Sequence, residues 1–240
     1  MVKATPTKSR TPFYGVLLLL ALAGAGGIWY SINGAKQKPI ELAKGTPLPK
    51  AEGYLRGDPN APVTIIEFAD FECPGCGQFA NVTEPDVRAR IIDAGLANIR
   101  YYDYPLPMHA NTMAASLAAS CAADQGKFWE MHDAIFAGQY DWNTQSTSNP
   151  RKIFDQYAAK LTLDMPTYNQ CYDSQKNLPR IEAHRNAGNE RGVGSTPTFL
   201  IGNKLYPVVM GYDQMKAIVD SLRAAVPAKP AAPTDSAKKK

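Results

Sequence analysis

Two cysteines separated by two residues constrain this chain most, because they lie where a predicted strand meets a predicted helix. The run Val63–Phe68 (VTIIEF) is short, apolar and β-branched, which predicts a strand buried on both faces. Cys73 and Cys76 follow in the segment ECPGCG. Pro74 between them favours the first position of a helix, where its missing N–H is no loss. We expect this helix to extend to about residue 94.

The rest of the chain predicts an α/β sheet that is interrupted by helices. A second strand is expected at 98–106, which makes a parallel βαβ unit with the first strand and its helix. Helices are then expected at 111–123, 126–137, 150–159, 165–173 and 178–193. Strands resume at 198–203 and 205–211 as an antiparallel hairpin. Asp213 is expected to cap a last helix at 214–225.

The position of the cysteine pair favours redox chemistry over two structural alternatives. Unpaired N–H groups and the dipole at a helix start stabilise a thiolate, so Cys73 is the expected nucleophile. Cys76, one turn later, can resolve a mixed disulfide. A structural zinc site needs four ligands, and neither the other two cysteines nor the three histidines have metal spacing. A purely structural bridge within CPGC would constrain little of the unfolded chain.

Two other residues bear on this chemistry. Glu67 lies in an apolar strand, where burying a carboxylate is costly. If it is buried, its raised pKa would let it take the proton of Cys76, whereas an edge position would expose it to water. Pro197 follows Thr196 just before a predicted strand, and X–Pro bonds are where cis peptides occur, although the sequence leaves the isomer open.

Other polar residues near these motifs have simpler expectations. His109 and His132 are expected on a helix surface or in packing, because neither has an evident partner. Asp70 and Glu72 flank the cysteine pair and are expected either to be solvated or to repel the thiolate slightly.

Three segments, APVTIIEFADFECPGC, GKFWEMHDAIF and GVGSTPTFLIG, in this order resemble the DsbA-like branch of the thioredoxin superfamily. The resemblance implies a thioredoxin fold with an inserted all-helical subdomain at about 110–193, and thiol–disulfide oxidoreductase activity. It implies Cys73 as nucleophile and Cys76 as resolving thiol. It also implies Glu67 as a buried acid and Pro197 as a cis proline that packs against the site. Such a site needs no metal and no organic cofactor.

The resemblance also indicates how a substrate peptide would bind. The backbone of Thr196 would form hydrogen bonds to the peptide, and Pro74 and Gly75 belong to the same substrate-binding set. The chain departs from the family at this dipeptide, because its strongest oxidants have a histidine between the cysteines. Pro74 and Gly75 supply neither a charge nor a side-chain donor. The disulfide is therefore expected to be less oxidising, and the direction of electron flow stays open.

The remaining cysteines, Cys121 and Cys171, both fall in the predicted helical block. In an oxidising compartment two such cysteines usually pair, and some DsbA-like proteins have a second disulfide in this block. We therefore predict a structural Cys121–Cys171 bridge, with two buried free thiols as the alternative.

The N-terminus predicts export across a membrane. Three basic residues and no acid precede the apolar run 13–30, which places the start in the cytoplasm and the remainder outside. Segment 1–30 is expected to be either an uncleaved anchor of roughly 18 residues or a signal peptide cleaved after Ala21-Leu22-Ala23. Trp29 and Tyr30 at the outer end favour the anchor, because such residues mark membrane interfaces.

Composition separates the predicted globular body from its ends. Residues 31–52 are rich in Lys, Pro and Gly and predict a linker, whereas 227–240 predict a disordered basic tail. The net charge of +4 comes from these ends, because removing +3 at each leaves 31–226 at −2. The folded body at 53–226 thus lacks the basic footprint of a nucleic-acid-binding protein.

These expectations combine into one functional hypothesis with two rivals. The chain is predicted to be a bacterial envelope enzyme, at the outer face of the inner membrane or secreted to the periplasm, that oxidises cysteine pairs of exported proteins. A membrane partner of the DsbB or VKOR type would then reoxidise it. The first rival is an extracytoplasmic reductase or isomerase. The second is a thioredoxin-fold chaperone or binding module without catalysis.

Overall fold

The computed structural model describes residues 18–25, 38–43 and 45–225. They belong to two units, one within residues 1–38 and one from Pro39 onward. In the first unit residues 18–25 form a helix with largely exposed leucines. The rest of the predicted anchor or signal peptide (1–30) and the predicted tail (227–240) lie outside the described residues. No helix within the described ranges combines the length and the apolarity needed to cross a membrane.

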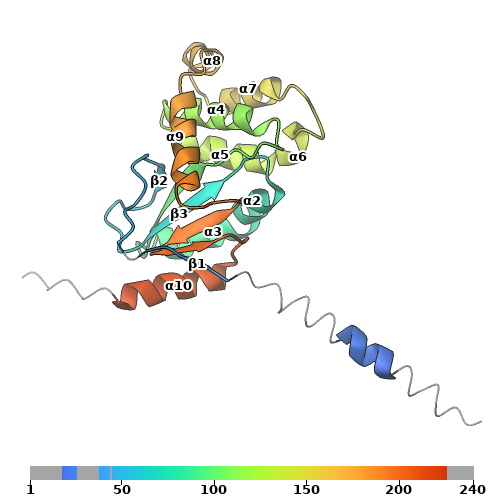
Figure 1. Ribbon diagram of the computed structural model, residues 1–240. Coiled ribbons are helices and arrows are strands. Elements are labelled where there is room, and N and C mark those ends of the chain that lie inside the picture. Colours follow the sequence, from blue (N-terminus) through green and yellow to red (C-terminus); the bar gives the residue numbers. More distant parts are fainter. Residues whose placement is uncertain (1–17, 26–37, 44, 226–240) are drawn as a thin grey trace, which may run out of the picture. The chain divides into compact units, whose positions relative to one another are not determined.

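A six-stranded sheet forms the centre of the second unit, with the order β1-β6-β5-β3-β4-β2 (Figure 1). Its strands are β1 (Ile40–Glu41), β2 (Tyr54–Arg56), β3 (Thr64–Ala69), β4 (Asn98–Asp103), β5 (Thr198–Ile201) and β6 (Lys204–Tyr206). The predicted βαβ unit is present, because β3 and β4 pair in parallel. The predicted hairpin is β5 with β6, and β3 also pairs with β5, both antiparallel.

The helix expected after Cys73 is a succession of short α and π segments. They are α2 (Pro74–Gln78), η1 (Phe79–Thr83), α3 (Glu84–Val87) and η2 (Arg88–Ile92). The inserted helices are α4 (Thr112–Ala123), α5 (Phe128–Ala137), α6 (Gln139–Trp142), α7 (Arg151–Lys160), α8 (Met165–Asp173) and α9 (Leu178–Asn189). Figure 1 shows them gathered at one end of the sheet, with the last helix, α10 (Tyr212–Ala225), at the other. The chain thus has the predicted thioredoxin-like α/β fold with an inserted helical region.

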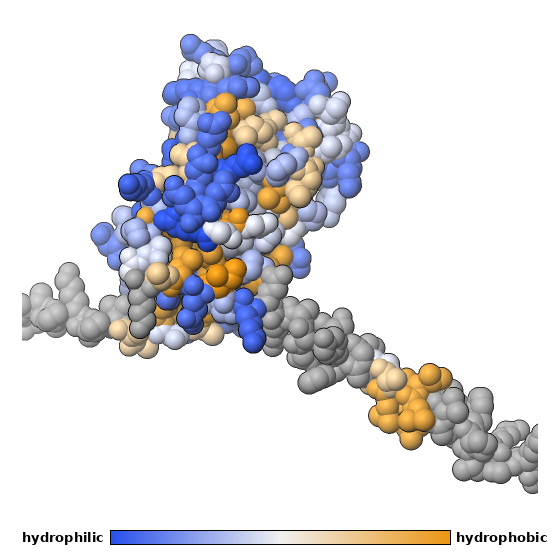
Figure 2. Space-filling model, viewed as in Figure 1, coloured by the Kyte–Doolittle hydropathy of each residue, from blue (hydrophilic) through white to orange (hydrophobic). Residues whose placement is uncertain are grey.

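Three apolar clusters hold these layers together. One joins the insertion to the sheet and contains both cysteines of the CPGC segment. A second packs α10 and the η2 region on the sheet, and a third fills the opposite face beneath α9. On the face shown in Figure 2, hydrophilic residues cover the α9 side of the insertion, and hydrophobic surface appears at the level of the sheet.

The structure differs from the expectations at several element boundaries. The predicted linker 31–52 contains β1, whose two residues pair with β6 and are too few to show a strand period. β2, which pairs with β4, is a further edge strand that the sequence did not predict. Asp213 does not precede α10 as a cap, because the helix begins one residue earlier at Tyr212. The strand expected to end at Gly211 ends at Tyr206.

Candidate active site

Cys73 stands immediately before α2, with extended backbone dihedrals of −70° and 124°, and Pro74 opens the helix. Both Cys73 and Cys76 are free and largely buried, so the structure represents the dithiol form. The Cys73 sulfur lies 3.4 Å from the Thr196 carbonyl oxygen. The Cys76 sulfur is fully buried and lies 3.5 Å from the backbone N–H of Asp70.

The two thiols have opposite pKa shifts. A hydrogen bond from the Cys76 thiol lowers the pKa of Cys73 to about 5, against the effect of burial, and Thr196 and the N–H groups of Cys76 and Gly75 lower it further. Burial raises the pKa of Cys76 well above its ordinary value, and the hydrogen bond to Cys73 adds to this effect. At neutral pH the pair therefore holds a Cys73 thiolate next to a protonated Cys76.

Glu67 lies on β3 in the interior of the sheet, between β4 and β5, with only 1% of its surface exposed. It therefore does not occupy a water-facing edge. Its Oε2 atom has no hydrogen-bond partner among the described residues. Burial, and then the charge of Glu84, raise the pKa of Glu67 well above its ordinary value, and Arg56 opposes them. The charge of Glu67 in turn raises the pKa of Cys76, so the two groups interact.

The Thr196–Pro197 peptide bond is cis, and it lies against the CPGC turn. A Cβ atom placed on Gly75 would be 3.2 Å from Pro197 Cδ, 3.1 Å from Val209 Cγ2 and 3.8 Å from the Cys73 sulfur. The Pro74-Gly75 dipeptide, Thr196 and Pro197 thus surround Cys73. A side chain at position 75 would crowd this arrangement.

Asp70 and Glu72 are buried structural anchors and not solvated flanking charges. Asp70 accepts the N–H of Glu72 on one carboxylate oxygen and the N–H of Leu106 on the other, both at 2.8 Å. The second oxygen also lies 2.8 Å from Nδ1 of His109, so His109 has a partner that the sequence did not reveal. His132 is buried among aromatic rings, in agreement with its expected packing role.

The insertion holds the active-site turn through side chains that sequence reasoning missed. Gln139, at the start of α6, donates from Nε2 to the carbonyls of Phe71 at 2.7 Å and Cys73 at 3.0 Å. The Glu72 carboxylate accepts the N–H of Asn111 at 2.8 Å and the N–H of Thr144. The four residues of α6 are too few to show helical periodicity, so no sequence signal places Gln139 here.

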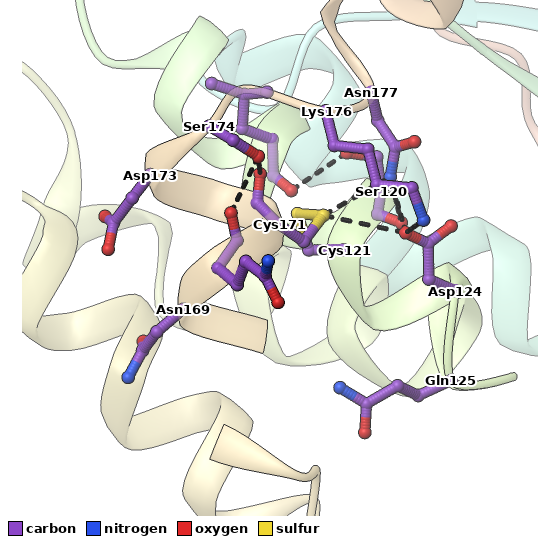
Figure 3. Close-up of a disulfide and its surroundings, with 12 residues drawn as sticks. Ser120, Cys121, Asp124, Gln125, Asn169, Cys171, Asp173, Ser174, Lys176 and Asn177 are labelled. Carbon is purple, nitrogen blue, oxygen red and sulfur yellow. Dashed lines mark hydrogen bonds and ion pairs between the residues drawn. A yellow bond between two sulfur atoms is a disulfide. The ribbon is translucent and has the colours of Figure 1, made fainter. Parts of the chain in front are cut away.

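Cys121 on α4 and Cys171 on α8 form a disulfide with a Cα separation of 5.8 Å (Figure 3). Beside it the Asp124 carboxylate accepts hydrogen bonds from Lys176 Nζ at 2.9 Å and Asn177 Nδ2 at 3.1 Å. Asn177 also donates to the Ser120 carbonyl at 3.0 Å. The disulfide joins α4 to α8, and the polar cluster joins the end of α4 to the segment that follows α8.

In the described part of the chain, Glu84, His132 and Asp133 could in principle hold a metal ion, since their ligand atoms lie within 4.8 Å of one another. The guanidinium group of Arg56 already pairs with two of these three residues. Arg56 Nη1 is 2.8 Å from Glu84, and Arg56 Nη2 is 3.4 Å from Asp133. This arrangement does not favour a second cation.

Comparisons with known proteins agree with this geometry. The family model described as thioredoxin matches residues 50–221. The chain belongs to the thioredoxin family, and it is similar to DsbA-like thiol–disulfide oxidoreductases.

Individual relatives include a transporter and a disulfide bond formation protein. The chain is 32% identical over 203 residues to the Na(+)/H(+) antiporter NhaA 3 of Salinispora tropica, covering 83% of this chain but only 29% of that protein. It is 23% identical to disulfide bond formation protein D of Bacillus subtilis, over 78% of this chain and 84% of that protein. The fold matches alpha-DsbA1 of Wolbachia pipientis with a TM-score of 0.65 and 24% identity, covering 75% and 94% of the two chains.

Proposed function

We propose that this chain donates the Cys73–Cys76 disulfide to cysteine pairs of proteins exported from a bacterial cell. The observation that supports this proposal best is the opposite shift of the two thiol pKa values, with Cys73 lowered to about 5 and Cys76 raised. A thiolate that is stable in the reduced protein is a good leaving group, and it makes the disulfide form more oxidising.

The proposed reaction has two displacements. A substrate thiolate attacks Cys73 of the disulfide form, and Cys76 leaves as a thiolate that takes a proton. Glu67 would give that proton, because burial keeps it protonated above the ordinary carboxyl range. The second thiolate of the substrate then attacks the substrate sulfur of the mixed disulfide and releases Cys73 as a thiolate. The substrate loses two electrons and gains a disulfide, and the enzyme becomes the dithiol.

The substrate is proposed to bind beside Cys73 as an extended peptide. The Thr196 backbone, which already lies within 3.4 Å of the Cys73 sulfur, would form hydrogen bonds to that peptide. Pro74, Gly75 and Pro197 would form the adjoining wall. This wall is tight, since even a Cβ at position 75 would press on Pro197.

We also propose an extracytoplasmic location and a membrane partner that restores the disulfide. The basic flank and apolar run within 1–30 support an anchor or a signal peptide, the segment 31–52 would connect it to the body at 53–226, and 227–240 would form a tail. One curated relative has the name disulfide bond formation protein D. A quinone-linked protein of the DsbB or VKOR type would accept the two electrons from the dithiol.

The reduction potential of Cys73–Cys76 tests the proposed direction. The full chain is equilibrated with glutathione buffers in detergent, and the dithiol fraction is measured by alkylation. A value near about −120 mV would agree with a disulfide donor, whereas about −270 mV would indicate a reductase. Failure to turn over cysteine peptides in either direction, together with tight binding of one protein, would indicate a binding module instead.

A further inference from the structure

We propose that His109, in its protonated form, stabilises the Cys73 thiolate and so sets how strongly the Cys73–Cys76 disulfide oxidises. The histidine would supply, from the loop before α4, the positive charge that the Pro74-Gly75 dipeptide lacks. This inference rests on Cys73 being the reactive thiol of the proposed function. It assigns to His109 a role beyond the packing expected from its sequence.

A single residue joins His109 to the cysteine turn. His109 Nδ1 lies 2.8 Å from Asp70 Oδ2, and the same oxygen accepts the N–H of Leu106 from the loop that contains the histidine. The backbone of Asp70 contacts both cysteines, because its carbonyl accepts the N–H of Cys73 at 3.1 Å and its N–H points to the Cys76 sulfur at 3.5 Å. The imidazole is therefore held at a defined place beside the turn, with 19% of its side chain exposed.

The charges that raise the pKa of His109 are all negative. The hydrogen bond to Asp70 raises the pKa of His109 above its ordinary value, against the effect of burial, and the charges of Asp70, Cys73 and Glu72 raise it further. Electrostatic interaction is mutual, so a thiolate that favours the imidazolium is itself favoured by it.

The sign of the pH dependence follows from these groups. The Cys73 thiolate forms as the pH rises through about 5. The imidazolium is lost as the pH rises through the raised pKa of His109. Between these two values the thiolate and the imidazolium coexist, so the extra oxidising strength is present there and falls at higher pH.

Alkylation of the full chain in its dithiol form tests this role. The rate with iodoacetamide is measured against pH for the unchanged protein, His109→Gln and His109→Lys. Cys76 is buried with a raised pKa, so the titration reports Cys73. We expect His109→Gln to raise the pKa of Cys73 by about half a unit or more, a roughly threefold loss of thiolate in the titrating range. Lysine should restore the low pKa, because it restores the charge.

A reciprocal titration uses the histidine as the probe. The pKa of His109 is followed by NMR in the dithiol and disulfide forms, and it should be lower in the disulfide form, which has no thiolate. Equal values in the two forms would overturn the inference. So would equal Cys73 titrations in the unchanged protein and His109→Gln, or an equal rise in both variants, which would indicate a purely structural role. An ordinary thiol pKa for Cys73 in the unchanged protein would instead contradict the proposed function itself.

Discussion

Substitution of Gly77 by alanine should loosen the active-site turn through Gln139. A Cβ atom on Gly77 would lie 2.6 Å from Gln139 Oε1 and 3.1 Å from its Cδ and Nε2 atoms. A glutamine at a surface could move aside at little cost. Gln139 is only 5% exposed, and its Nε2 donates to the carbonyls of Phe71 and Cys73, so it cannot retreat without breaking both bonds.

These two hydrogen bonds determine the expected loss of stability. The Cys73 carbonyl also accepts the N–H of Gly77, so losing Gln139 there costs about 1 kcal/mol, the net value of one hydrogen bond. The buried Phe71 carbonyl loses its Gln139 donor, which costs about 1–3 kcal/mol. Replacing glycine by alanine within a helix such as α2 itself adds about 0.5–1 kcal/mol of stability, because glycine is a poor helix residue. The Gly77→Ala protein should therefore be less stable by about 1–3 kcal/mol.

A double-mutant cycle with Gln139→Ala separates this mechanism from a general effect of alanine. Once the glutamine is removed, Gly77→Ala should become neutral or stabilising, which gives a coupling energy of about 2 kcal/mol. Urea unfolding of the dithiol forms measures all four proteins. Gly194→Ala, where a Cβ would meet nothing within 4 Å, serves as the matched control. An equal cost of Gly77→Ala with and without Gln139 would refute the reasoning.

Three further predictions concern the cysteines and the buried acid. The pKa of Cys73 is lowered to about 5 in the folded protein. The dithiol form should therefore become more stable than Cys73→Ser as the pH rises from about 5 toward the ordinary thiol pKa. Urea unfolding midpoints of both proteins across pH will show whether this gain exists. Glu67→Gln should stabilise the fold at and above neutral pH, because the raised pKa of Glu67 makes its ionisation in the folded state costly. The same substitution should slow disulfide exchange in stopped-flow assays. Unchanged exchange rates would exclude a proton-transfer role for Glu67. Replacing Cys121 and Cys171 by alanine opens a loop with a sequence separation of 50. In the chain-entropy model this should lower the free energy of unfolding by about 4 kcal/mol. The alkylation rate of Cys73 at fixed pH should stay the same.

The fold could be predicted where the sequence has strong local patterns. The sequence predicts the apolar run of β3, the helix start at Pro74 and the five longer insertion helices, and the structure contains all of them. The edge strands β1 and β2 and the helix α6 are two to four residues long, so their patterns are too short to detect. Their formation depends on partners far along the chain, such as β6 for β1.

Residues of the site could be predicted only where they belong to a recognisable sequence motif. The CPGC segment, Glu67 and Thr196-Pro197 stand out in the sequence because each contradicts its local surroundings or is chemically distinctive. Asp70, His109 and Gln139 look ordinary in the sequence, because a polar residue near a turn is usually solvated. Their roles come from the packing of the loop before α4 and of α6 against the turn, which brings together residues separated by 39 and 68 positions.

The attachment of the cysteine turn to the insertion has a consequence for local unfolding. Gln139, Asn111 and Thr144 all hold the turn from the inserted region, whereas the sheet continues without them. Proteins open in cooperative units that share such contacts, so the turn should belong to the same unit as the insertion. A fluctuation that lifts the insertion would then disorder the redox centre while the sheet persists. The helical region would in this way determine how long the thiol pair keeps its reactive geometry.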